Sequence, residues 1–303
     1  MDTTTSTSTK GQSLARVAIA YVVAVGAGAA WLYAGPDTAH LWLDSLIADL
    51  IGTVVIFGFS RAYRNSSFYD AYWSVVPPLF ALYWWTEAGA TADGTDQARV
   101  WLVLVVVWFW AIRLTGNWIY AFPGLHHEDW RYPMLRARAG KGELVADLFG
   151  IHVIPTLQVF LGMVPLYVAV TGITRDLGWL DPVAVAVGVG AVLLEWTADV
   201  QMYRFAATKQ PGQVMDRGLW AWSRHPNYFG EFAFWCALGI FGFAASPDHA
   251  WWVFVGAVGM LAMFQGASIP MMEQRSIERR PAYAEVVARI PRFVPRPPRR
   301  SVA

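Results

Sequence analysis

Residues 100–112 of the chain read VWLVLVVVWFWAI, an uncharged run that continues as mostly apolar sequence to residue 121. A helix needs about 20 such residues to cross the hydrocarbon layer of a bilayer. Because lipid offers the backbone no hydrogen-bond partners, a helix is the form that such a segment takes. The stretch from residue 99 to 121 is therefore predicted to span a membrane.

Seven further stretches share this character, near residues 14–34, 42–60, 71–89, 146–172, 182–201, 230–247 and 250–271. The fold class predicted from them is all-α, a polytopic membrane bundle of about eight transmembrane helices. The composition agrees, since 56% of the 303 residues are hydrophobic and 15% are charged, against about 25% charged residues in a typical soluble domain. The net charge of +1 favours no nucleic-acid partner, and we expect no obligate protein partner.

Basic residues gather in every second loop, and Lys and Arg in short loops stay on the cytoplasmic side. The alternate loops, residues 35–41, 90–98, 173–181 and 246–250, are short and carry acids with few bases. This asymmetry predicts that both termini are cytoplasmic. Lysine supplies only 3 of the 23 basic residues, which indicates a GC-rich bacterial genome, so we expect a bacterial inner-membrane protein.

The domain boundaries follow from the same pattern. Residues 1–13 begin with the low-complexity sequence MDTTTSTSTK and are expected to form a disordered tail. Residues 14–271 form the transmembrane domain. Residues 272–303 form an arginine-rich cytoplasmic tail, in which the segment 273–289 is predicted to be an amphipathic helix that continues the last span.

Three polar segments stand out on the predicted cytoplasmic side. The first runs from Arg113 and Asn117 to the sequence HHEDWRY at residues 126–132. Adjacent histidines point in different directions and no cysteine joins them, so we expect no metal site. A structural interpretation is an arginine that reaches the interface, together with an ion pair between Glu128 or Asp129 and Arg131.

The second segment places Glu195 and Asp199 four residues apart at the end of an apolar helix. Two acids on one helical face are unfavourable unless a positive or hydrogen-bonding group meets them. Two interpretations remain open: a salt bridge to a loop arginine, or acceptors for the ribose or amide groups of a cofactor.

The third segment, residues 216–231, reads DRGLWAWSRHPNYFGE and is followed by Trp235. Asn227, Glu231 and Trp235 are spaced by four and share one face of the helix that follows Pro226. Unpaired N–H groups and the positive dipole end of a helix N-terminus suit a phosphate. The alternative is a purely structural polar cluster.

The sequence SRHPNYFGE at residues 223–231, with RPAY at 280–283 and PRFVP at 291–295, resembles the C-terminal region of the steroid 5α-reductase superfamily. The segment HEDWRY at 127–132 resembles the bacterial branch of that superfamily known as DUF1295. The likeness covers residues 70–299, and the reductase-like C-terminal part begins near residue 182.

The resemblance implies a seven-helix reductase core with an extra N-terminal helix. Such a protein binds NADPH from the cytosol and reduces a C=C bond conjugated to a carbonyl in a lipophilic, steroid- or isoprenoid-like molecule that arrives from the membrane lipids. By this resemblance Asp199, Asn227, Glu231, Trp235 and Tyr283 match positions that contact NADPH, and Glu195 matches a further one. The loop arginines Arg217 and Arg224 would suit the phosphates of the cofactor, and His225 and Tyr228 of the same turn complete the candidate cofactor residues.

One departure concerns the catalytic acid. Animal steroid reductases carry a Gln-Glu pair before a proline in an early helix, and the comparable sequence here, YWSVVP at residues 72–77, has no glutamate. Asp70 and Tyr72 are then the candidates that polarise the carbonyl. Two other functions stay open: an S-adenosylmethionine-dependent methyltransferase of the isoprenylcysteine carboxyl methyltransferase type, whose Arg-His-Pro-x-Tyr turn is similar, and a non-enzymatic lipid- or sterol-binding protein.

Overall fold

The computed structural model describes residues 9–90, 93–172, 174–249 and 251–297, and all regular elements in these ranges are helices. The chain divides into two compact units. The first comprises residues 1–91 and 110–161, and the second comprises residues 92–109 and 162–303. Helix α4 (Gln97–Ala121) contributes to both units. The polytopic all-α fold predicted from the sequence is confirmed.

The first unit begins with α1 (Lys10–Ala34), whose first turn is closed by a capping box. The side chain of Thr9 accepts a hydrogen bond from the backbone N–H of Gln12, and the side chain of Gln12 accepts one from the backbone N–H of Thr9. This reciprocal cap satisfies N–H groups at the helix start. The helix therefore begins within the predicted disordered tail of residues 1–13, of which residues 1–8 lie outside the described part of the chain.

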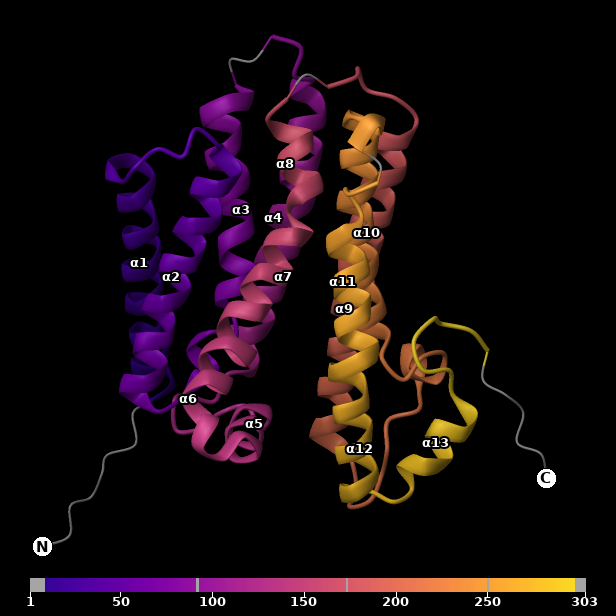
Figure 1. Ribbon diagram of the computed structural model, residues 1–303. Coiled ribbons are helices and arrows are strands. Elements are labelled where there is room, and N and C mark those ends of the chain that lie inside the picture. The colour runs from indigo at the N-terminus through magenta and orange to yellow at the C-terminus, as the bar shows by residue number, and fades with distance from the viewer. Residues whose placement is uncertain (1–8, 91–92, 173, 250, 298–303) are drawn as a thin grey trace, which may run out of the picture. The chain divides into compact units, whose positions relative to one another are not determined.

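Helix α1 packs against α2 (Leu41–Tyr63), as Figure 1 shows. A Cβ added at Gly28 would lie 3.1 Å from the carbonyl oxygen of Ala48. Small residues at such a crossing let two helix backbones approach closely, which is a common mode of packing in membranes.

The stretch predicted near residues 71–89 forms α3 (Tyr72–Trp84) and a π-helical continuation at Trp85–Gly89. Pro77 and Pro78 lie inside this helix, and Glu87 lies near its end. Among the described residues, seven helices have the length and hydropathy of a span, so the predicted count of eight is one too many by that measure. The prolines, aromatic residues and Glu87 lower the hydropathy of the stretch around α3. The seven are Lys10–Ala34, Leu41–Tyr63, Gln97–Ala121, Arg131–Val170, Leu180–Thr208, Pro226–Ala245 and Val255–Arg279.

The span predicted at 146–172 is part of a longer, segmented helical run. Its pieces are α5 (Arg131–Ala139), a 3₁₀ turn at Gly140–Gly142, α6 (Glu143–Val145), a π-helical stretch at Ala146–Val153, α7 (Ile154–Gly162) and α8 (Val164–Val170). Pro165 stands at the first turn of α8. Because proline lacks an N–H group, a helix is readily interrupted just before it.

In the second unit, α9 (Leu180–Thr208) packs along α10 (Pro226–Ala245), and Figure 1 shows the two side by side. A Cβ at Gly230 would lie 2.5 Å from Cγ of Glu195 and 3.0 Å from the carbonyl oxygen of Ala191. Glycine is therefore what allows this part of α10 to lie so close to the side chain of Glu195.

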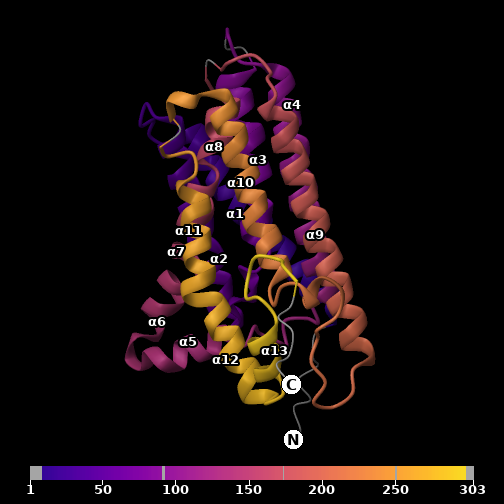
Figure 2. The ribbon, with the colours of Figure 1, turned by 90° about the vertical axis from the view of Figure 1, so that its right-hand side faces the viewer.

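The last span is built from α11 (Val255–Met263), a π-helical stretch at Phe264–Ser268 and α12 (Ile269–Arg279). A separate helix, α13 (Tyr283–Arg289), follows it, as Figure 2 shows. The single helix predicted for residues 273–289 is thus interrupted. The reason is Pro281, which cannot donate a backbone hydrogen bond and forces Arg280 out of helical geometry.

Candidate functional site

The turn before α10 is held against the end of α9. The side-chain oxygen of Gln201 accepts a 2.9 Å hydrogen bond from the backbone N–H of Leu219. The indole N–H of Trp220 donates to the carbonyl oxygen of Ala198 at 2.9 Å. Gly218 adopts a φ of 59°, and a Cβ there would meet the side chain of Gln201. These contacts place Arg224 and His225 at the mouth of α10.

Arg224 is buried, and its guanidinium group donates hydrogen bonds to acceptors of the protein. Its Nε donates to Oε1 of Glu273 at 2.6 Å, and its Nη1 donates to the carbonyl oxygens of Val287 at 2.9 Å and Ile290 at 2.6 Å. Arg224 therefore ties the start of α10 to α12 and to the end of α13. The predicted contact of this guanidinium with a phosphate would require it to exchange these partners.

Glu273 also contacts His225, and its charge acts on Tyr283. Nε2 of His225 lies 3.1 Å from the same Oε1 atom. Burial lowers the pKa of His225, even though the neighbouring carboxylate favours its charged form. Burial, together with the charge of Glu273, raises the pKa of Tyr283 to about 12. The sequence interpretation gave Glu273 no role, although an acid at the end of an apolar span was a usable signal.

The predicted acceptors are distributed over α9 and α10. The amide nitrogen of Asn227 donates to Oδ1 of Asp199 at 3.3 Å, and the indole N–H of Trp235 donates to Oε1 of Glu231 at 2.8 Å. Glu195 packs against Gly230, one residue before Glu231. The side chains of Glu195, at 2% exposure, and Glu231, at 7%, are both buried.

The remaining two cofactor candidates lie elsewhere in this unit. The hydroxyl of Tyr228 donates to Sδ of Met272 at 3.7 Å, and its ring packs edge-on against Phe264 at 4.7 Å between centroids. Tyr228 therefore faces the last span. Arg217 is exposed in the turn before α10.

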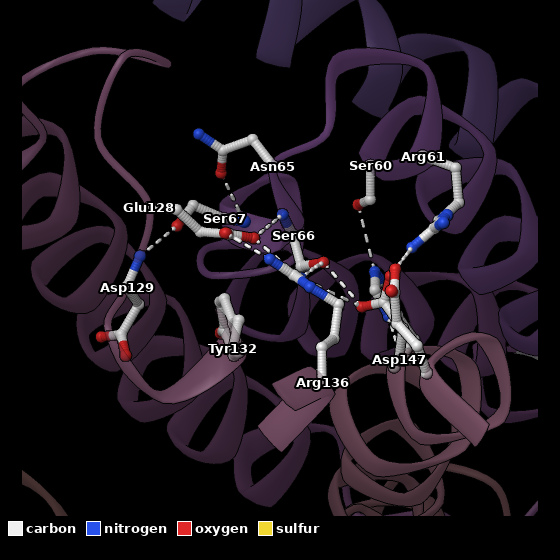
Figure 3. A network of polar contacts seen from close by, with 12 residues as sticks. Ser60, Arg61, Asn65, Ser66, Ser67, Glu128, Asp129, Tyr132, Arg136 and Asp147 are labelled. Carbon is white, nitrogen blue, oxygen red and sulfur yellow. Dashed lines mark hydrogen bonds and ion pairs between the residues drawn. The ribbon is translucent and has the colours of Figure 1, made fainter. Parts of the chain in front are cut away.

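The first unit contains a polar network of its own, which joins the turn after α2 to the run that follows residue 130 (Figure 3). Glu128 accepts hydrogen bonds from the backbone N–H of Ser66 at 2.7 Å and from Nη1 of Arg136 at 3.0 Å. The hydroxyl of Ser66 donates to Oδ1 of Asp147 at 2.7 Å. We call Ser66, Glu128, Arg136 and Asp147 the loop network.

Two residues of α2 extend the loop network. Nη1 of Arg61 lies 3.0 Å from Oδ2 of Asp147 and 2.9 Å from Oε1 of Glu143. The hydroxyl of Ser60 lies 3.1 Å from Nε2 of His152, whose Nδ1 lies 2.8 Å from the carbonyl oxygen of Asp147. The loop network therefore fixes the end of α2 against the π-helical stretch.

The HEDWRY segment is held to the same turn. Nε of Arg131 lies 2.8 Å from Oδ1 of Asp129, which confirms the ion pair expected in the structural interpretation. Burial alone would raise the pKa of Asp129, but the hydrogen bonds and charge of Arg131 outweigh it and hold that pKa below its usual value. The side chain of Asn65 donates to the carbonyl oxygens of Leu125 and His127, both at 2.9 Å.

The two candidate acids have different partners. The carboxylate of Asp70 accepts a hydrogen bond from the hydroxyl of Tyr132, and burial raises the pKa of Asp70 to about 6. The hydroxyl of Tyr72 instead donates to Oδ1 of Asp49 at 3.3 Å, inside the helix bundle. Asp49 lies within the apolar run predicted at residues 42–60 and was not among the candidate residues. Both candidate acids belong to the first unit, whereas the ten cofactor candidates belong to the second.

Within the described ranges, no group of three or more His, Cys, Asp or Glu side chains is arranged to hold a metal ion.

Comparison with known proteins gives two matches. Residues 56–290 match a family described as a protein of unknown function, DUF1295. The chain is also 27% identical over 274 residues to "Uncharacterized protein C594.04c" of Schizosaccharomyces pombe, an alignment that covers 83% of this chain and 78% of that protein. No solved structure matches. The family match begins within α2, so α1 and most of α2 precede it.

Proposed function

The chain belongs to the DUF1295 family, a member of the steroid 5α-reductase-like group, and from this premise we propose that it is an NADPH-dependent membrane reductase. Its substrate is a lipophilic, steroid- or isoprenoid-like molecule that enters from the bilayer. Its reaction reduces a C=C bond conjugated to a carbonyl. We further propose that it resides in a bacterial inner membrane with both termini in the cytoplasm.

The observation that carries this proposal is the presence of buried carboxylates on the paired helices α9 and α10. Glu195 on α9 and Glu231 on α10 are buried, and Asn227 of α10 donates to Asp199 of α9. A carboxylate has two oxygens and can accept several hydrogen bonds at once. The hydroxyl groups of a ribose and the amide of a nicotinamide are donors, so these residues fit that part of a dinucleotide.

The fit to the phosphates is less complete. Arg224 is engaged with Glu273 and two backbone carbonyls. Arg217 is exposed in the turn before α10 and has the free reach that a phosphate ligand needs. We therefore propose that Arg217 meets the phosphates, and that Arg224 and His225 maintain the shape of the site together with Glu273.

When bound, the cofactor supplies a hydride. In the proposed reduction the substrate would gain a hydride at its β-carbon and a proton at its α-carbon, while negative charge would develop on the carbonyl oxygen. The protein must stabilise the charge that develops on that oxygen. A carboxyl group with a pKa of about 6, as at Asp70, is protonated in about a tenth of molecules at pH 7. We propose Asp70 as this acid, with Tyr132 as its positioning residue; Tyr72 is the other candidate.

The test is ligand-dependent stability of the purified protein in mild detergent. A ligand at about 100 times its dissociation constant adds roughly 2.7 kcal/mol to the free energy of unfolding. We expect NADPH to raise the melting temperature and S-adenosylmethionine to leave it unchanged. Stabilisation by S-adenosylmethionine alone would replace the proposal with a methyltransferase, and a folded protein that responds to neither would favour a lipid-binding function.

A further inference from the structure

The longest candidate span, Arg131–Val170, has 40 residues. A helix needs about 20 apolar residues to cross the hydrocarbon layer, so only part of this run lies within it. The run also changes direction, because Gly140 ends α5 with a φ of 53°, and Figure 2 shows α6 leaving at an angle to α5. The side chains around this bend show where the run enters the hydrocarbon.

An exposed apolar face begins directly after the 3₁₀ turn at Gly140–Gly142. Leu144 is 56% exposed, Val145 is 61% exposed and Phe149 is 49% exposed. Asp147, which lies between them in the sequence, is 1% exposed and belongs to the loop network. The inward face of this stretch is therefore polar and its outward face is apolar, as expected for a surface in contact with lipid chains.

Two cations, Arg138 and Lys141, stand just before this apolar face, and both are exposed. From Lys141 to Val145 a helical run rises about 6 Å, at 1.5 Å per residue. The headgroup layer on each side of a bilayer is about as thick, since a bilayer measures about 40–45 Å with its headgroups and about 30 Å without them. Lys141 thus lies at the depth of the lipid phosphates when Val145 lies at the edge of the hydrocarbon.

The carboxylates at this end of the first unit are matched to other arginines. The ion pairs are Glu128 with Arg136, Asp129 with Arg131, and Glu143 and Asp147 with Arg61. None of the ion pairs within the described ranges involves Arg138 or Lys141. These two residues therefore form a local excess of positive charge at the edge of an apolar surface.

We propose that this surface binds one anionic phospholipid. Arg138 and Lys141 hold its phosphate group, and an acyl chain lies along Leu144, Val145 and Phe149. We call these five residues the lipid site. A lysine or arginine close to anionic lipid strengthens binding about fivefold.

The chemistry of the lipid site selects among phospholipids. A zwitterionic lipid carries a cation beside its phosphate, and this cation is repelled by the two basic side chains. A free anion lacks the acyl chain that the exposed apolar face is placed to meet. The lipid site shares no residue with the cofactor candidates or the proposed acids, so it does not depend on the proposed reduction.

The experiment is photo-cross-linking of the full-length protein in mild detergent with phosphatidylglycerol that carries a diazirine in one acyl chain, followed by peptide mapping. Phosphatidylcholine with the same acyl chain is the matched probe. We expect phosphatidylglycerol to label residues 144–149 about tenfold more than phosphatidylcholine does. Equal labelling of these residues by the two lipids would overturn the proposal.

Two double variants separate the lipid site from a general attraction of anionic lipid to the protein. The double variant Arg138→Gln, Lys141→Gln should lower labelling by phosphatidylglycerol to nearly that by phosphatidylcholine. The double variant Arg204→Gln, Lys209→Gln removes the same charge from exposed positions near the end of α9 and should leave the labelling of residues 144–149 unchanged. An equal fall in both double variants would mean that net charge alone attracts the lipid, and the site would be abandoned.

A measurement on the wild-type protein tests the same contact without any substitution. Raising the salt concentration from about 0.1 M to about 1 M shortens the screening length from about 10 Å to about 3 Å. The preference for phosphatidylglycerol at residues 144–149 should then fall severalfold, while labelling by phosphatidylcholine changes little. A preference that does not respond to salt would contradict the role of Arg138 and Lys141.

Discussion

Nε of Arg224, at the start of α10, lies 2.6 Å from Oε1 of Glu273 on α12. Both side chains are largely buried, so each compensates the charge of the other. The same stretch of chain is tied further by the hydroxyl of Ser223, which donates to the carbonyl oxygen of Phe293 at 2.7 Å. The C-terminal segment is thus an integral part of the second unit.

Glu273→Gln should therefore destabilise the protein by about 3 kcal/mol, because Arg224 would be left as a buried charge without its carboxylate. It should also expose the chain after residue 280 to proteases. Chemical unfolding and limited proteolysis measure the two effects. Glu278→Gln, at an exposed position of the same helix, is the control; equal stability of the two variants would show that the pair does not hold the tail.

The raised pKa of Asp70 predicts how the stability of the protein depends on pH. Burial raises the pKa of Asp70 to about 6, from the usual 3.8. Because the folded protein holds this proton more tightly than the unfolded chain, the contribution of Asp70 is fully present below pH ~4 and is lost as the pH rises through ~6. The loss is at most about 3 kcal/mol, and the partial exposure of Asp70 reduces it.

The measurement is the melting temperature from pH 4 to 7.5 in wild type and Asp70→Asn. The variant should lack the fall in stability that wild type shows between pH ~4 and ~6. Parallel pH profiles for the two proteins would mean that Asp70 ionises normally, and its proposed role as an acid would then have to be abandoned.

Arg61 has two carboxylate partners that differ in burial. Removing the charge of each should therefore lower the free energy of unfolding by a different amount. Asp147 is 1% exposed in its side chain, whereas Glu143 is 49% exposed. Asp147→Asn should cost about 2–3 kcal/mol, because Ser66 and Arg61 lose a charged acceptor inside the loop network. Glu143→Gln should cost less than about 1 kcal/mol. Denaturant titration of the two variants compares these costs directly, and similar values would contradict the importance assigned to burial.

A larger residue at the position of Gly230 should destabilise the protein. In Gly230→Ala, the new methyl group would lie 2.5 Å from Cγ of Glu195, so α9 and α10 must separate or Glu195 must move. We expect a lower melting temperature and weaker binding of NADPH. Gly190→Ala, on α9 with open space around its Cβ, is the control and should preserve both. Normal NADPH affinity in a folded Gly230→Ala variant would place the cofactor away from Glu195.

The helices were predictable because their backbone hydrogen bonds are local and their apolar runs are long. The spacing of Asn227, Glu231 and Trp235 also predicted one common face, and the bond between Glu231 and Trp235 is in keeping with it. The break before α13 had a visible cause in Pro281. Such features depend on residues within a few positions of each other.

The partners of the candidate acids were not predictable in the same way. Tyr132 lies 62 residues from Asp70, and Asp49 lies 23 residues from Tyr72. Nothing in the spacing of these residues says which of them meet, since that depends on how whole helices pack. The role of Glu273 was missed for the same reason, because the hydrogen bonds that define it come from residues 48 and 49 positions away.

We propose above all that the acceptors on α9 and α10 bind NADPH. The most direct measurement is the dissociation constant of NADPH for wild type, Glu231→Gln and Glu285→Gln in the same detergent. Glu285 is exposed on α13 and serves as the control. The account predicts that Glu231→Gln raises the dissociation constant about tenfold or more, equivalent to about 1.4 kcal/mol, while Glu285→Gln matches wild type. Equal affinity in all three proteins would contradict it.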